Sequence, residues 1–171
     1  MTADPESADP LADPSGSVAD YWHRHGFDGD EQQFLTFTAL LRYQRLVADA
    51  VDSTLKKRGL NTTDYLVLMT LQLSEDGTQL ISSLARHLMV HATTATLATD
   101  RLERRLFVRR SPHPTDRRAT CVAITDDGRR IADEATRALT TIGFGMRDGS
   151  AGEVAQLRDA IAALLPSTGP G

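Results

Sequence analysis

Arginine is concentrated in one part of this chain. Residues 86–118 contain eight arginines and only three acidic residues, although the whole protein has a net charge of −4. Because guanidinium groups pair well with phosphate oxygens, a cationic segment in an acidic protein indicates an anionic partner. A solvated surface without a partner is the alternative reading of such a charge run. The eight are Arg86, Arg101, Arg104, Arg105, Arg109, Arg110, Arg117 and Arg118.

Three short helices are predicted around these arginines. Asn61 is a strong N-cap residue, and Asp64 three positions later completes a capping-box pattern. Apolar residues at helical spacing then predict a helix over about 79–87 and another over about 92–105. The small residues that would let these two helices approach closely are Ala85, Ala92, Ala95 and Ala98. This arrangement predicts a helix-turn-helix.

Two strands are predicted after the third of these helices. Phe107–Arg110 and Thr120–Ile124 carry strand-forming residues. Pro112 and Pro114 lie between them and predict a loop, because proline cannot donate to a strand ladder. A helix-turn-helix followed by a hairpin is a winged helix-turn-helix. In that fold the helix at 92–105 enters the major groove of DNA, and the hairpin tip reaches the minor groove.

The candidate DNA-contacting residues lie on the second and third of these helices and at the hairpin tip. Threonine can hydrogen-bond to a base or a phosphate, and its methyl group, like Leu97, can touch the methyl group of thymine. An exposed threonine face without any DNA contact is the alternative. The candidates are Ser82, Arg86, Thr93, Thr94, Thr96, Leu97, Arg101, Arg104, Asp116, Arg117 and Arg118.

Two later helices are marked by their first residues. Thr125 precedes a stretch of helical periodicity that runs to about Ile142. Ser150 and Glu153 form a capping box for a last helix, which ends at Pro166. Hydroxyl and carboxylate oxygens at these positions accept hydrogen bonds from free backbone N–H groups, so both helix starts are expected to be sharply defined.

The chain is expected to be mainly α-helical, with a small β-hairpin wing. Residues 1–29 predict a disordered acidic tail with an aromatic arm, because positions 1–20 contain almost no large apolar side chains. Residues 30–58 and 127–166 predict a helical dimerisation region, and residues 60–125 predict the DNA-binding domain. A helix over 30–57 would be roughly 40 Å long, which in a small chain is typical of an oligomer.

Several motifs resemble those of the MarR family of transcriptional regulators over about residues 31–165. Leu84-Ala85, Thr94-x-Thr96 and Asp100-Arg101-Leu102-Glu103 are similar to the family's helix-turn-helix. The more specific match is to its wing: Asp116-Arg117-Arg118-Ala119, then Val122-x-Ile124-Thr125 and Gly128. The resemblance implies that Asp116 braces Arg118, that Arg118 enters the minor groove, and that Arg117 contacts or supports a phosphate.

The same resemblance implies a homodimer and a small-molecule pocket between the dimer region and the DNA-binding part. A small aromatic or phenolic effector is expected there. Aromatic residues at helical spacing more often belong to a core, which is the alternative for each candidate. The candidate pocket residues are Phe34, Phe37, Tyr43, Tyr65 and Met69.

The chain departs from the family pattern at two positions. Leu97 stands where the family often has a basic residue, so the first two turns of the reading helix carry no charge. Leu106 stands where the family commonly has glycine. If the backbone there is left-handed, a leucine is strained.

Other classes of function receive little support from these residues. The sequence has no nucleophile–base pair, phosphate-binding loop or dinucleotide-binding loop, so neither an enzyme nor a cofactor is expected. His87 and His91 lie one helical turn apart, but with only the distant His113 as a third ligand they predict no metal site. The single Cys121 excludes an intramolecular disulfide and fits a reducing cytoplasm. No apolar run approaches the roughly 20 residues of a membrane span.

The prediction is therefore a cytoplasmic, dimeric, ligand-responsive repressor that binds a pseudo-palindromic operator. One alternative is a module on the same scaffold that sequesters a small molecule or binds a protein and has only weak affinity for DNA, since the first two turns of the reading helix are uncharged. Another is a sensor that responds through a metal or through Cys121.

Overall fold

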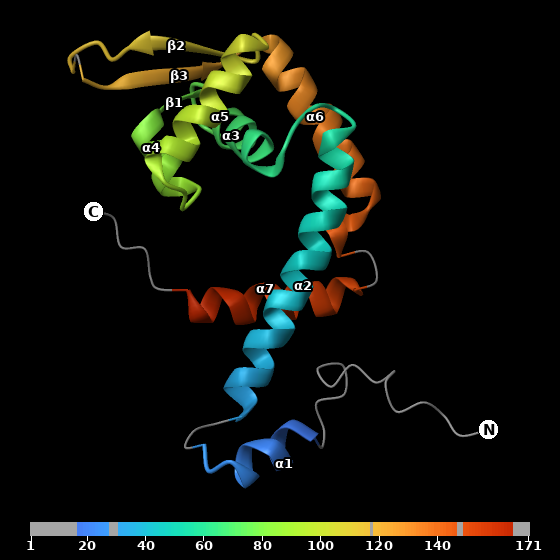
Figure 1. Cartoon of the computed structure of the whole chain (residues 1–171). Helices are drawn as coiled ribbons and strands as arrows, with labels where there is room; N and C mark the ends of the chain where they lie inside the picture. The colour runs from blue at the N-terminus through green and yellow to red at the C-terminus, as the bar shows by residue number, and fades with distance from the viewer. Residues whose placement is uncertain (1–16, 28–30, 117, 147–148, 166–171) are drawn as a thin grey trace. The chain divides into compact units, whose positions relative to one another are not determined.

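A computed structural model describes residues 17–27, 31–116, 118–146 and 149–165. The chain forms two compact units, residues 1–48 and residues 49–171. Figure 1 shows helices throughout both units and a small sheet in the second. Among the described residues, no helix combines the length and apolar character needed to cross a bilayer.

The first unit contains helix α1 (Ser17–Arg24) and most of helix α2 (Glu31–Lys56). The ring of Trp22 lies 5.1 Å from that of Phe27 and 5.3 Å from that of Phe34 in the first turn of α2. The prediction of a disordered tail is wrong for residues 17–20, because they form the start of helix α1, whose Trp22 packs on Phe34 of α2. Residues 1–16 of that tail lie outside the described part of the chain.

The second unit contains the winged helix-turn-helix. Its further helices are α3 (Thr62–Gln72), α4 (Ile81–His87), α5 (Ala92–Arg104), α6 (Asp126–Thr141) and α7 (Ala151–Leu164). The predicted N-caps are confirmed. Asn61 and Asp64 form the capping box of α3, Thr125 accepts from the Gly128 amide, and Ser150 and Glu153 form the capping box of α7.

The sheet has one strand more than the predicted hairpin. Strands β2 (Val108–Pro112) and β3 (Thr120–Ile124) form that hairpin, which projects beyond α3–α5 in Figure 1. Strand β1 (Thr78–Leu80) pairs antiparallel with the other side of β3, giving the order β1-β3-β2. The prediction of helix from residue 79 is therefore wrong, and α4 begins at Ile81.

Strand β2 runs two residues further than the sequence pattern predicted. Ser111 pairs with Cys121 and Pro112 with Thr120. Proline is tolerated there because β2 is an edge strand and Pro112 is its last residue, so no interior ladder bond is lost. Cys121 is half-buried on β3.

The core of the second unit lies between α3, α5, α6 and the sheet. Its fully buried residues include Val67 and Leu68 on α3, Leu102 on α5, Val122 on β3 and Leu139 on α6. Burying large apolar side chains stabilises a domain by about 1.5–3 kcal/mol each. This core holds α5 and the hairpin together in one unit, so the two elements have a fixed position relative to each other.

Candidate nucleic-acid interface

Helix α5 presents one buried face and one exposed face. Ala95, Ala98, Thr99 and Leu102 are completely buried. The two buried alanines allow α5 to lie close to α3 and α4, whereas Ala92 is exposed. The side chains on the exposed face do not pack in the core and are available for contact with a partner.

The predicted reading residues divide by exposure. Thr93, Thr94 and Arg104 are exposed, and Leu97 is 53% exposed. Thr96 is half-buried, and its hydroxyl donates to the Ala92 carbonyl oxygen over 3.0 Å. The structure thus brings four of the predicted residues to the open face of α5.

Arg101, which was predicted to contact DNA, forms an ion pair within the protein. Its guanidinium donates to Asp64 Oδ1 through Nη2 over 2.7 Å and through Nε over 3.1 Å. Asp64 is only 4% exposed, so the pair links the start of α3 to the reading helix. The geometry makes Arg101 a structural link between two helices, and its charge is largely neutralised by a buried partner.

Helix α4 contributes two further predicted residues. Ser82 and Arg86 are both exposed, and Arg86 Nη2 lies 3.5 Å from the hydroxyl of Ser83 on the same helix. Helices α4 and α5 are joined by a short turn through Met89, which has a φ of 49° and is 79% exposed. Because Arg86 is exposed, its guanidinium lies on the surface of α4.

The hairpin tip is shaped by side-chain acceptors. Asp116 Oδ1 accepts from the backbone N–H of Arg118 over 2.9 Å, so the contact with Arg118 is to its main chain. Nδ1 of His113 accepts from the amides of Asp116 and Thr115 over 3.2 and 3.4 Å. Arg118 is exposed, and Arg117 lies outside the described residues.

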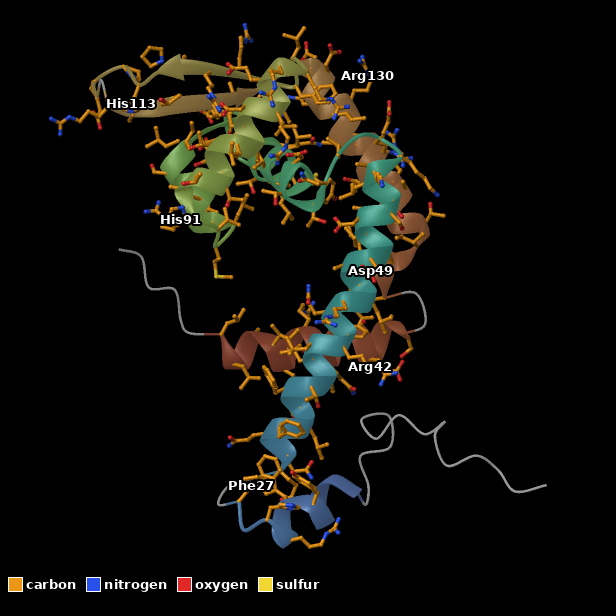
Figure 2. All side chains as sticks on the ribbon, viewed as in Figure 1. Phe27, Arg42, Asp49, His91, His113 and Arg130 are labelled. Atoms are coloured by element: carbon orange, nitrogen blue, oxygen red, sulfur yellow. The ribbon has the colours of Figure 1, made fainter. Side chains whose placement is uncertain are left out.

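Two histidines organise this surface and were not predicted to do so. Figure 2 shows His113 near the far end of the hairpin and His91 at the start of α5. His91 is the N-cap of α5, where its Nδ1 accepts from the Thr93 amide over 3.3 Å. N-cap residues are usually Ser, Thr, Asp or Asn, so the capping pattern in the sequence did not identify His91 as the cap of α5.

Arg110 joins the hairpin to the reading helix. It pairs with Asp100, and its Nη2 donates to the Thr96 carbonyl over 3.1 Å. Its backbone N–H donates to Glu103 Oε1 over 3.1 Å. These contacts fix the orientation of β2 on α5. Two of the three acidic residues in the arginine-rich segment, Asp100 and Glu103, are spaced at i and i+3 on α5 and pair with Arg110, and this spacing could have indicated the contact.

The predicted pocket residues are divided between the two units. Phe37 and Tyr43 on α2 are exposed, and Phe34 packs on Trp22. Tyr65 on α3 is buried in the core, and its hydroxyl lies 3.0 Å from that of Thr136 on α6. The hydroxyl of Thr136 also contacts the sulfur of Met69. The pocket remains a prediction from the sequence.

A metal site is not formed by the described residues. His87 and His91 do not gather with other potential ligands there, since no group of three or more His, Cys, Asp or Glu side chains lies close enough to hold an ion.

Comparison with known proteins identifies the same region. The model of the MarR family matches residues 60–120. The chain is 31% identical over 98 residues to the HTH-type transcriptional regulator MhqR of Bacillus subtilis, a match that covers 57% of this chain and 66% of MhqR. The alignment thus spans just under two thirds of that relative.

Solved structures extend the similarity to most of the chain. Sco5413, a MarR family transcriptional regulator from Streptomyces coelicolor, is 32% identical and has a TM-score of 0.73, with 78% of this chain and 92% of that chain covered. Sco3205, another such regulator from the same organism, was solved in complex with DNA. It is 20% identical with a TM-score of 0.70, covering 81% of this chain and 91% of its own, and therefore shows the shared fold.

Proposed function

Because this chain belongs to the MarR family of transcriptional regulators, we propose that it is a dimeric, ligand-responsive repressor that binds a pseudo-palindromic DNA site. Helix α5 enters the major groove, and Arg118 at the hairpin tip enters the neighbouring minor groove. The supporting observation is that α5 has a fully buried stripe and an open face within the same unit as a projecting hairpin with an exposed arginine.

The residues proposed to contact DNA are those of the predicted set that are exposed on the protein surface. On α5 they include Thr93, Thr94, Leu97 and Arg104, and on α4 they include Ser82 and Arg86. Arg101 is assigned to the link with Asp64 instead. Cationic side chains near phosphate release condensed counterions, so the affinity should fall steeply as salt is raised.

Dimerisation is supported by apolar side chains that a single chain leaves exposed. On α2 these are Phe37, Leu40, Leu41 and Leu46, which are 45–61% exposed. On α7 and its C-cap residue they are Ile161, Leu164 and Leu165, which are 40–82% exposed. Two reading helices related by a two-fold axis would then occupy successive major grooves about 34 Å apart.

The ligand response rests on family resemblance. A small aromatic or phenolic effector would favour a dimer whose reading helices have the wrong separation for DNA, and so would release the site. Protein thermal shift with a panel of phenolic compounds tests this, since a ligand that binds the folded protein raises Tm by an amount that grows with the logarithm of its concentration over its Kd.

The wing is tested by replacing Arg118. Fluorescence anisotropy with a labelled duplex from DNA upstream of the protein's own gene should show that Arg118→Ala weakens binding by about tenfold. Arg137→Ala removes the same charge from the exposed surface of α6 and is the matched control. Equal affinities for the two variants would exclude the hairpin tip from the interface.

A module with weak DNA binding is the second candidate. The observation that favours it is the absence of charge on the first two turns of α5 combined with the pairing of Arg101 to Asp64. Footprinting separates the two functions, because a dimeric regulator should protect about two helical turns, roughly 20 base pairs, at a defined site.

A further inference from the structure

The first two turns of the reading helix expose threonine and leucine side chains, which carry methyl groups and no charge, and this points to the bases that the helix recognises. We infer that α5 selects its DNA site chiefly through the methyl groups of thymine, with Leu97 as the central contact. This inference rests on the proposed function and adds to it the kind of base that the helix reads.

Among the residues in the first two turns of α5, Thr94 alone keeps a side-chain hydroxyl proton that is not engaged within the helix or its cap. Ala92 and Leu97 are exposed and apolar. The hydroxyl of Thr93 lies 3.1 Å from Nδ1 of His91, which already accepts the Thr93 amide, so the hydroxyl is the donor of that contact. The hydroxyl of Thr96 donates to the Ala92 carbonyl. Their hydroxyl protons are therefore engaged within the helix, while their methyl groups add to the apolar surface.

Two arginines close to these turns, Arg101 and Arg110, are held by partners within the protein and are not free to recognise a guanine base. Guanine is read best by a bidentate arginine or lysine on its O6 and N7 atoms. Arg101 is held by two hydrogen bonds to Asp64, and moving it into the groove would leave a buried carboxylate without its partner. Arg110 is held by Asp100 and by the Thr96 carbonyl. Neither guanidinium is positioned to read guanine.

Thymine is the base whose major-groove edge suits such a surface. Its C5 methyl group is the one apolar feature that the four base pairs present there. Contact between that methyl and Leu97, which is 53% exposed in the protein alone, removes apolar area from water on both sides. The other arginines of the interface then contribute affinity through phosphate, without choosing the base.

The inference is tested on a site chosen by the protein. The full-length chain is used to select duplexes from a random-sequence pool. Each thymine of the selected site is then replaced in turn by deoxyuridine, which removes the C5 methyl and keeps every hydrogen-bonding group. At one or more positions in each half-site, binding should weaken about fourfold, the equivalent of one lost methyl contact.

The variant Leu97→Ala tests whether Leu97 makes the contact with the thymine methyl group. Leu97→Ala should bind the selected site more weakly and should no longer distinguish thymine from deoxyuridine at the position that Leu97 faces. Arg118→Ala is the matched control, since it should lose affinity yet keep the full sensitivity to deoxyuridine. Because Leu97 is exposed, its replacement leaves the core intact.

The outcomes separate this inference from the function on which it rests. Tight, selective binding with no loss at any deoxyuridine position, or retained sensitivity in Leu97→Ala, would overturn methyl reading and leave the regulator function standing. A selected site with guanine at every position facing α5 would do the same. Failure to select any DNA would overturn both.

Discussion

At the scale of single residues, the surface proposed to meet DNA is organised by two histidine rings. His113 accepts two backbone amides at the hairpin tip, and His91 caps the reading helix. The ring of His91 holds the backbone of Thr93, and the ring of His113 holds the backbone of Asp116, whose side chain in turn accepts from the Arg118 amide. Both act as positioning residues whose role is to limit the conformations available before binding.

The hairpin tip should lose its preferred shape when His113 is replaced. His113→Ala is expected to weaken DNA binding by about fivefold, because one net hydrogen bond contributes about 1 kcal/mol. His113→Asn is the matched variant, since the Asn side-chain oxygen can accept the same amides as in an Asx-turn. Anisotropy titrations of both variants test this, and an equal loss in His113→Asn would exclude the acceptor role.

Glu153 provides a pH-dependent contribution at the start of α7. Hydrogen bonds from the Ser150 hydroxyl, and then from the Ser150 backbone, lower the pKa of its carboxyl below the ordinary value of 4.5. Since the folded-state pKa is the lower one, this contribution is fully present above about pH 4.5 and is lost as the pH falls through the lowered value. NMR titration should give a midpoint below 4.5 for Glu153, and Ser150→Ala should move it upward. An unchanged midpoint in that variant would contradict the assigned cause.

At the scale of elements, the connection from α5 to β2 has a strained backbone. Leu106 has a φ of 61°, so the backbone there is left-handed, which is the condition under which a leucine in place of the family's glycine was expected to be strained. The Leu106 side chain is 72% exposed, so it lies outside the buried stripe of α5. Its carbonyl accepts from the Thr125 hydroxyl over 2.7 Å, so the turn also supports the start of α6.

Relief of this strain should stabilise the protein. Leu106→Gly is expected to raise the free energy of unfolding by about 0.5–1 kcal/mol, because glycine adopts positive φ freely and little buried apolar area is lost. Leu106→Ala keeps the Cβ atom and therefore the strain, so it should bring no such gain. Urea denaturation of the three proteins measures the difference. A destabilised glycine variant would show that the side chain stabilises the turn more than the strain costs.

At the scale of the whole molecule, the exposed apolar residues of α2 and α7 predict an assembly of two chains. Leu164→Glu places a charge on a side chain that is 82% exposed, so the fold of one chain should survive while the proposed dimer dissociates. Leu73→Glu, at a position that is 79% exposed beyond the end of α3, is the control and should leave the dimer intact.

Sedimentation velocity measures the outcome for both variants. Loss of the dimer should also lower DNA affinity greatly, because each half-site would then be bound separately. A native protein that sediments as one chain would contradict the two-fold arrangement on which the proposed operator geometry depends.

The sequence alone determined the features that depend on neighbouring residues. The N-caps at Asn61, Thr125 and Ser150 are confirmed, because a cap is a hydrogen bond between a side chain and an amide two or three positions away. The order of helices and hairpin followed from periodicity, and the wing motif identified the family.

Only the tertiary structure decided which distant residues meet. Asp64 and Arg101 are separated by 36 residues, and local pattern could equally have left that arginine free to contact DNA. Strand β1 has three residues and exists only because β3, some 40 positions later, offers it a free edge. Such contacts form only when folding of the core brings distant segments together. Sequence periodicity describes neighbouring residues and therefore does not predict them.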